Sequence, residues 1–435
     1  MISNNNHTKF VQPDGFTGAL LACESILDGA VVLHGPTGCR AHHSALSEMV
    51  FPRDISPEKL NFLEPYFFGQ PRIPTTYLDG DDFVFGAREK LVKALQEIIK
   101  RNPSLISIIN SPGAALIGDN IAQSIAEAKL SIPCAVVEMP KLSHSLAEGY
   151  QQGLIAMLQS LSLPPLPPRA RKVTLIGLSS VHHYWSGGVA ELQRLLALCG
   201  IEVICAVGAG STIEEYRHIP SAACHAVVYN EYADRIGPWL AQHYGGAIAT
   251  SDWGAPVGFP ATEAWVKAVA YAVKADPLPA LEDIRQQRRR VSRLIGQATG
   301  SAAALKGLSF AVQTDPSIAW PLARWLYEYI GMLPVAVDTS DYTATPLAVQ
   351  LQTWMESIGC AGAWQKPWRS AQPDLLFADG CQSAQARGSG CCGAIDLILP
   401  AEARLDIVPK AVLGAAGGTW LVEWILRELS WALQM

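Results

Sequence analysis

Several familiar signatures are missing from this 435-residue chain, and each absence excludes a class of function. No stretch matches GxxxxGK[ST], which excludes a P-loop site for ATP. No apolar run reaches the roughly 18 residues that cross a bilayer, and the polar residues 1–6 do not form a signal peptide. The net charge is −6, whereas proteins that bind nucleic acid carry clusters of positive charge. These absences predict a cytoplasmic protein whose main partner is neither a membrane nor a nucleic acid.

The ten cysteines show neither a CxxC spacing nor a disulfide-like rhythm. In a cytoplasmic protein we therefore expect them to be reduced. Five of them lie in or beside apolar strand and helix patterns and are predicted to be core residues: Cys134, Cys199, Cys205, Cys224 and Cys360.

Apolar strand patterns alternate with helical patterns along the whole chain. Examples are strands at 105–109 and 173–178, and helices at 144–160 and 231–243. Such alternation is typical of parallel sheets with helices on both faces. We predict an α/β fold made of three consecutive Rossmann-like units with mainly parallel sheets around a central cleft.

Two segments separate the predicted units. Residues 163–169 are rich in proline and form a stiff connector, and the arginine-rich helix 280–297 precedes the third round of alternation. The predicted units are 1–165, 170–280 and 281–435, the last ending in a long C-terminal helix.

The most informative loop follows the strand pattern at 31–33. The chain turns through Gly35, Pro36 and Gly38 and then presents Cys39, at the carboxyl end of a strand where α/β sheets bind ligands. Cys39 can reach a metal or an iron–sulfur cluster, or it can be a buried free cysteine. One cysteine cannot hold a cluster alone, so a metal site here needs further ligands.

Two other places could carry chemistry. His182 and His183 follow the first strand of the second unit and are candidate proton donors, although a surface loop without chemistry is the alternative. Cys381, Cys391 and Cys392 are predicted to lie on a glycine-rich loop after strand 375–377, where they could hold a cluster or a soft metal, or pack without one.

Taken in order, several motifs resemble the nitrogenase component 1 superfamily, which includes the subunits of nitrogenase and of its tetrapyrrole-reducing relatives. Residues 34–39, HGPTGC, resemble the family loop whose cysteine ligates a cluster between two subunits. Further similarity lies at GFTGA (15–19), at Thr75-Thr76 followed by DFVFGA (82–87), at ALIGDN (115–120) and at GAAGG (414–418).

The departures from the family pattern are informative. The resemblance places the family's first cluster cysteine on Asp14 and its third on Pro112, which cannot ligate a metal. It also places Tyr229 where nitrogenase has a cofactor cysteine. Asp14 is therefore either a carboxylate ligand or a turn or helix-cap residue.

The resemblance implies a [4Fe–4S] cluster held by Cys39 and Asp14 and shared between subunits of a homodimer, or with a sister subunit in a heterodimer or heterotetramer. It further implies low-potential electrons from a separate ATP-hydrolysing iron protein, and a further metallocluster or a tetrapyrrole as a candidate ligand. The expected function is that of a nitrogenase-like reductase subunit. A scaffold for metallocluster assembly and a cluster-free small-molecule binding protein are the alternatives.

Overall fold

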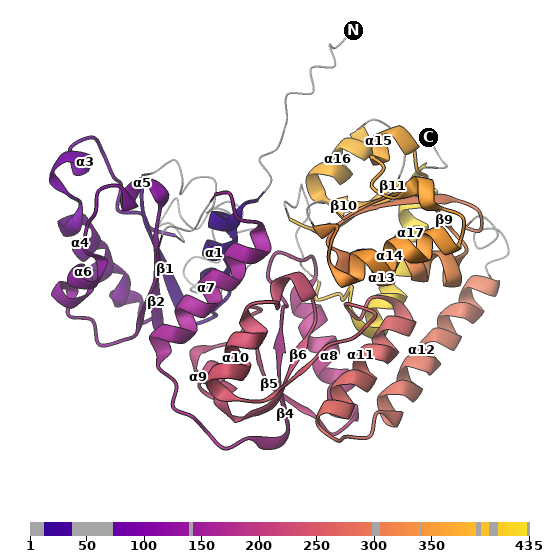
Figure 1. Cartoon of the computed structure of the whole chain (residues 1–435), viewed down its shortest axis with the longest axis horizontal. Coiled ribbons are helices and arrows are strands. Elements are labelled where there is room, and N and C mark those ends of the chain that lie inside the picture. Colours follow the sequence, from indigo (N-terminus) through magenta and orange to yellow (C-terminus); the bar gives the residue numbers. More distant parts are fainter. Residues whose placement is uncertain are drawn as a thin grey trace, which may run out of the picture.

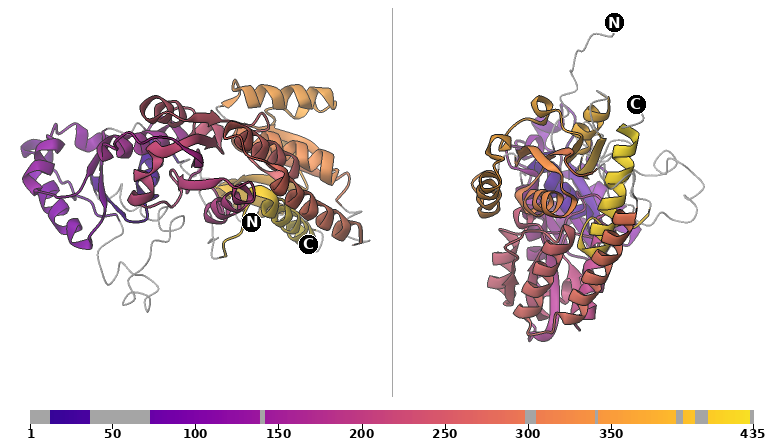
Figure 2. Two further views of the ribbon diagram at one scale, coloured as in Figure 1. Left: turned by 90° about the horizontal axis from the view of Figure 1, so that it is seen from below. Right: turned by 90° about the vertical axis from the view of Figure 1, so that its right-hand side faces the viewer.

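The computed structural model describes residues 13–36, 73–138, 142–297, 305–339, 342–388, 393–399 and 408–432. Its strands form three separate parallel sheets, each made from one continuous part of the chain. Figure 1 shows three α/β units, and Figure 2 shows that they lie along an elongated molecule with the first unit at one end. The predicted fold class, three successive α/β units with parallel sheets, is confirmed, whereas the proposed domain boundaries stay a prediction.

The first unit has three strands in the order β1-β2-β3. Every residue of β1 and β2 is buried, because helices cover both faces of this sheet, and Gly29 of β1 pairs with Leu105 of β2. Its elements are α1 (Gly15–Glu24), β1 (Gly29–His34), α3 (Asp82–Phe85), α4 (Arg88–Ile98), β2 (Leu105–Asn110), α5 (Pro112–Ala115), α6 (Ile121–Ala128), β3 (Cys134–Glu138) and α7 (Leu146–Leu161).

The second unit has four strands in the order β5-β4-β6-β7. The predicted helix over 231–243 begins later than expected, because residues 230–232 form a separate 3-10 turn before α10. The elements are β4 (Arg169–Ile176), α8 (Trp185–Leu198), β5 (Glu202–Ala206), α9 (Ile213–Arg217), β6 (Ala222–Val227), α10 (Ile236–Tyr244), β7 (Ala247–Ala249), α11 (Gly258–Ala272) and α12 (Leu278–Gln297).

The third unit also has four strands, in the order β11-β10-β8-β9. Its last helix contacts α8, α11 and α12 of the second unit and so joins the two units. The elements are β8 (Ser309–Gln313), α13 (Pro316–Trp325), β9 (Leu333–Asp338), α14 (Pro346–Ser357), α15 (Trp368–Ala371), β10 (Leu375–Asp379), α16 (Gly380–Gly388), β11 (Gly393–Ile398) and α17 (Gly414–Ala432).

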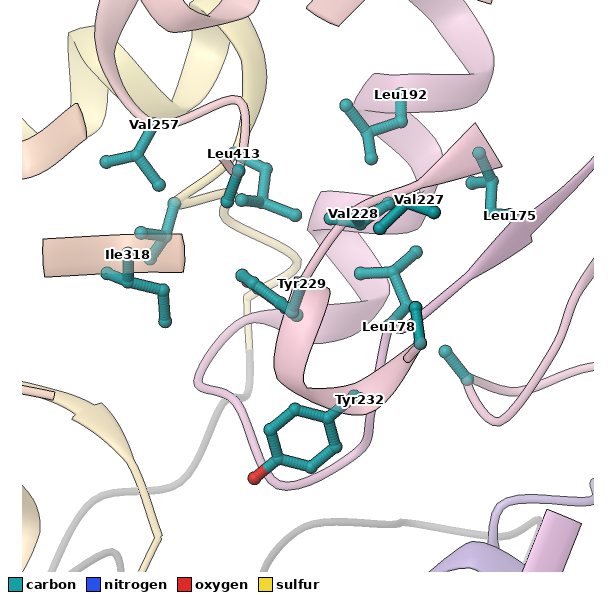
Figure 3. Packing of buried hydrophobic residues seen from close by; sticks show 14 of the residues in the cluster. Leu175, Leu178, Leu192, Val227, Val228, Tyr229, Tyr232, Val257, Ile318 and Leu413 are labelled. Carbon is teal, nitrogen blue, oxygen red and sulfur yellow. The ribbon is translucent and has the colours of Figure 1, made fainter. Parts of the chain in front are cut away.

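One large apolar core runs through all three units. Figure 3 draws part of this core: Val227 and Val228 of the second unit together with Val257, Ile318 and Leu413, which come from the segment before α11, from α13 and from the segment before α17. Within the described residues, no helix combines the length and the apolar character that a membrane-spanning segment needs.

Candidate functional site

The stem of the predicted cysteine loop is held by two threonines. His34 Nδ1 and the Gly35 N–H both contact Thr76 Oγ1, each at 3.1 Å, and the Thr75 hydroxyl donates to the Gly35 carbonyl. Leu33 pairs with Thr75 in a parallel bridge. These bonds fix the direction in which the chain leaves β1 toward Cys39.

Glycine is required at position 35 because another segment approaches it closely. A Cβ atom there would lie 2.8 Å from Ser111 Oγ, and the Ser111 hydroxyl oxygen in turn accepts from the Ala114 N–H at 3.2 Å to cap α5. Pro112 occupies the first turn of that helix. The position that the resemblance assigns to a third cluster cysteine is thus a helix start.

His34 is fully buried, and one carboxylate lies close to its ring. Its Nε2 lies 3.8 Å from Asp119 Oδ2, and that oxygen accepts the Ala87 N–H at 2.7 Å. Burial lowers the pKa of His34, while Asp119, Asp82 and Glu138 partly oppose this shift. The motifs at 82–87 and 115–120 therefore meet at the stem of the Cys39 loop.

Cys39 itself lies outside the described residues, as do Cys391 and Cys392. Their ligand roles stay predictions. Among the residues that the structure does describe, no three histidines, cysteines or carboxylates gather closely enough to hold a metal ion.

Asp14 caps α1, as one of its two interpretations predicts. Its Oδ1 accepts from both the N–H and the hydroxyl of Thr17, each at 2.9 Å. Asp14 also pairs with Ser145 in an antiparallel bridge, at the start of α7. A ligand role for Asp14 stays a prediction.

Close packing of α1 on α7 fixes the position of that cap. A Cβ atom at Gly149 would overlap the Gly15 carbonyl, and one at Gly18 would overlap the Leu146 carbonyl. Glycine at these positions lets the two helix backbones touch. The first turn of α1 therefore sits rigidly against the first turn of α7.

Cys381 does not lie on a loop, and this prediction was wrong. It occupies the first turn of α16, which begins directly after β10, and it is 4% exposed. Strand β10 is thus followed directly by a helix, without the glycine-rich loop that the sequence predicted at Cys381. This burial favours packing over metal binding at Cys381.

His182 and His183 are buried, which excludes a surface loop. His182 is 2% exposed, its Nδ1 lies 2.6 Å from Ser179 Oγ, and its ring stacks on Tyr229 with centroids 3.9 Å apart. Burial lowers the pKa of His182 to about 3, and the neighbouring His183 adds to this shift. His182 is therefore neutral near pH 7, and its Nε2 has no hydrogen-bond partner among the described residues.

The loop that carries His182 joins the second unit to the third. The His183 N–H donates to the Leu397 carbonyl at 3.0 Å, and the Leu399 N–H donates to the Val181 carbonyl at 2.9 Å. The carboxyl ends of β4 and β11 consequently meet. In parallel sheets this edge is where ligands bind.

A second group of residues surrounds His182 and Tyr229, and four of its members were not identified from the sequence: Glu231, Tyr232, Asp315 and Ser317. We call His182, Tyr229, Glu231, Tyr232, Asp315 and Ser317 the junction site. Glu231 follows β6 and accepts both the N–H of Ser317, at 3.0 Å, and its hydroxyl. Tyr232 lies edge-on to His182, with centroids 5.1 Å apart. In Figure 3 the Tyr232 hydroxyl points away from the aliphatic core.

Helix α7 of the first unit also reaches this site. Gln151 donates to the Glu231 carbonyl at 3.0 Å and accepts the Arg235 and Ile236 N–H groups at 2.8 and 3.0 Å. All three units therefore contribute to the junction site. One signal in the sequence could have identified Glu231 and Asp315, because each is an acidic residue that comes just after a buried strand.

Large apolar side chains are exposed near the Cys39 stem. Phe85 is 85% exposed and Leu116 is 84% exposed. Phe85 belongs to α3, and Leu116 directly follows α5; Ala87, which comes after α3, and Ala114 of α5 pack in one small buried cluster. Tyr77, Phe83 and Val84 are also exposed, and we call these five residues the apolar patch. Exposed apolar patches of this kind mark interaction surfaces.

Comparison with known proteins gives consistent matches. The family model for nitrogenase component 1 type oxidoreductases matches residues 15–426. A nitrogenase molybdenum-iron protein beta chain from Methanococcus maripaludis is 23% identical over 357 residues, which cover 74% of this chain and 71% of the relative. One of the subunits of a light-independent protochlorophyllide reductase, from a Synechococcus species, is 26% identical over 286 residues, covering 62% of this chain and 51% of the relative.

One relative has a biosynthetic role, and one solved structure shares the fold. The nitrogenase iron-molybdenum cofactor biosynthesis protein NifE from a Nostoc species is 27% identical over 236 residues, covering 53% of this chain and 45% of the relative. The solved structure of nitrogenase Cp1 at pH 6.5 aligns with a TM-score of 0.74 at 17% identity, covering 96% of this chain and 92% of that one.

Proposed function

Because this chain belongs to the family of nitrogenase component 1 type oxidoreductases, we propose that it is a catalytic-component subunit of a nitrogenase-like reductase. In this proposal the subunit receives low-potential electrons from a separate ATP-hydrolysing iron–sulfur protein. An iron–sulfur cluster shared between two subunits passes them to a substrate at the junction site.

The observation that carries the proposal is the construction of the Cys39 stem. The end of β1 is contacted by three residues far from it in sequence, Thr76, Ser111 and Asp119. Such support suits a loop that must present one side chain at a fixed place. Cys39 would supply a thiolate ligand, and Asp14 a carboxylate oxygen.

The number of ligands favours a shared cluster. One subunit offers Cys39 and Asp14, whereas a [4Fe–4S] cluster takes four ligands. Two copies related by twofold symmetry would supply them, and a cysteine-richer sister subunit would also do so. The bound cluster would supply one-electron transfer at low potential.

The apolar patch supports the need for an electron-donating partner. Tyr77 of the patch directly follows Thr76, which contacts the chain just after β1, so a protein docked there would lie near the predicted cluster. The chain has no P-loop motif of its own, so ATP hydrolysis is assigned to that partner.

The similarity to NifE favours a second candidate function, a scaffold on which a metallocluster is assembled. A scaffold would release its cluster to an acceptor protein, whereas a reductase would keep it through many turnovers. A relative that binds only a small molecule would contain no iron.

Anaerobic purification, alone and with a co-expressed sister subunit, tests these functions. The reductase predicts iron and sulfide in the protein and ATP-dependent reduction when the iron protein is added. Transfer of the cluster to apo-acceptor would instead support the scaffold. Iron-free protein with Cys39 intact would overturn both.

A further inference from the structure

A cavity of about 300 Å³ opens at the edge of the first sheet, beside the second unit. Its walls are the last three residues of β3, one side of α7, and Arg235, which directly precedes α10. Among the described strands, β3 is the outermost of its sheet, so no strand fills the space beside it. This volume is at the lower limit of typical small-molecule sites, which predicts a compact ligand.

Opposite charges line this cavity without neutralising each other. Glu138 and Arg235 both contribute to its wall and are exposed, yet within the described residues no ion pair joins them. The Arg235 guanidinium, which has five N–H groups, pairs with Glu148 through Nη2. Asn110 Nδ2 donates to Glu138 Oε2 at 2.7 Å, and no described residue forms a hydrogen bond with Glu138 Oε1. Both charged groups therefore keep bonding capacity for a ligand.

Two neighbouring glutamines of α7 hold the backbone at both charged residues. Gln151 Oε1 accepts the Arg235 N–H at 2.8 Å, and Gln152 Nε2 donates to the Glu138 carbonyl at 3.3 Å. One turn of α7 therefore sets the distance between the carboxylate and the guanidinium. Gln152 also lines the cavity, and its Oε1 has no hydrogen-bond partner among the described residues. Such an acceptor favours a ligand that brings a donor to it.

The rest of the cavity wall is mainly apolar. Beyond Gln152, it consists of Ile155 and Ala156 of α7 together with Val136 and Val137 of β3. An α-helix rises 1.5 Å per residue, so this apolar part begins about 5 Å from the charged end. A ligand that fits both parts carries charges of both signs at one end and a short aliphatic chain at the other.

We propose that this cavity binds a free α-amino acid with an aliphatic side chain. The carboxylate of the ligand pairs with Arg235, its ammonium group donates to Glu138 Oε1 and Gln152 Oε1, and its side chain packs against Ile155 and Val136. Because the ligand contacts β3 and α7 of the first unit and Arg235 of the second, its binding also strengthens the contact between these units. The site does not rest on the proposed reductase function.

Saturation-transfer difference NMR spectroscopy, with the full chain and leucine as the probe, tests this site. Leucine should bind the wild type at least tenfold more tightly than 4-methylpentanoate, which lacks the ammonium group, or 3-methylbutylamine, which lacks the carboxylate. Arg235→Gln and Glu138→Gln should each weaken leucine binding at least tenfold, because one of the two charges is lost. Arg427→Gln is the matched control and should bind like the wild type, since Arg427 is exposed and pairs with Glu423 outside the cavity.

Each outcome decides the proposal. Absence of leucine binding to the wild type overturns it, and so does equal binding of leucine by the wild type and both charge variants. Binding of 4-methylpentanoate as tightly as leucine overturns the amino acid assignment, because Glu138 would then not contact the ammonium group. If a charge variant fails to fold, Ala156→Leu replaces it, since the larger side chain fills the apolar part of the cavity. This variant should bind leucine at least tenfold more weakly, and an unchanged affinity overturns the proposal.

Discussion

Two buried histidines, His34 and His182, lie near the carboxyl ends of parallel strands, and their surroundings differ in kind. His34 faces Thr76 and Asp119, with two further carboxylates nearby. His182 contacts a serine hydroxyl and two tyrosine rings. The first arrangement holds a loop in place beside a carboxylate, whereas the described groups that shift the pKa of His182 include no carboxylate. The Nε2 atom of neither ring has a hydrogen-bond partner among the described residues. A histidine at the end of a strand therefore indicates a candidate site. The groups around the histidine decide whether it supports a loop or is available to a ligand.

The largest expected effect is the loss of bound iron when Cys39, in the loop that follows His34, is replaced. Cys39→Ala should abolish bound iron, because the proposed cluster loses its thiolate. Cys381→Ala is the matched control and should keep the iron, since Cys381 is buried in the first turn of α16. Iron and sulfide analysis of the anaerobically purified proteins measures both. Retained iron in Cys39→Ala would contradict the proposed cluster site.

Acidification should distinguish the two histidines. The folded-state pKa of His182, about 3, lies below its unfolded value of 6.5, so its contribution to stability is complete above pH 6.5 and is lost as the pH falls. Between pH 6.5 and 4.5 this loss should be roughly 2–3 kcal/mol. In His182→Phe, whose ring can still stack on Tyr229, the free energy of unfolding should fall less steeply as the pH is lowered. Urea unfolding experiments at several pH values measure this slope.

The matching variant at the other site is His34→Gln. This variant should change the dependence of the unfolding free energy on pH less than His182→Phe does. The reason is that three carboxylates favour the protonated His34 ring and oppose the pKa shift caused by burial. Equal flattening in the two variants would show that the carboxylates around His34 have no effect on its titration.

The support of the Cys39 stem can be tested at Thr76. Thr76→Val removes the oxygen that His34 and the Gly35 N–H contact, which should lower the free energy of unfolding by about 2 kcal/mol. Thr75→Val is the control with a smaller effect, because the Gly35 carbonyl also accepts from the Leu78 N–H at 3.4 Å. Urea titration of both variants gives the difference, and a larger loss in Thr75→Val would refute this account of the stem.

The smallest effect separates the two interpretations of Asp14. Asp14→Ala should cost about 1 kcal/mol through the lost helix cap, whereas Asp14→Asn should keep most of that stability, since asparagine caps well. If Asp14 is also a ligand, Asp14→Asn should still lose iron or change the electron paramagnetic resonance spectrum. Full iron and an unchanged spectrum in Asp14→Asn would leave only the cap.

Local sequence patterns predicted the three α/β units well. The alternation of strands and helices, and the burial of strands such as β2, follow from the apolar pattern of a few neighbouring residues. They missed the junction site, since the hydrogen bond from Ser317 to Glu231 joins residues 86 positions apart. They also placed Cys381 on a loop, because glycine and cysteine beside a strand carry no clear helix signal. The threonines that hold the Cys39 stem, Thr75 and Thr76, stood out only through the family resemblance, because no local pattern marks their contacts with Gly35.

The distance along the chain between Glu231 and Ser317 has a consequence for biosynthesis. A ribosome that adds roughly 5–20 residues per second needs about 4–17 s to synthesise the chain from one to the other. During that interval the second sheet can form, but the Glu231 carboxylate lacks the Ser317 donor and must stay in water. Nascent chains that stall between these two codons should therefore expose the loop after β6 to protease, and become resistant there once α13 has been made.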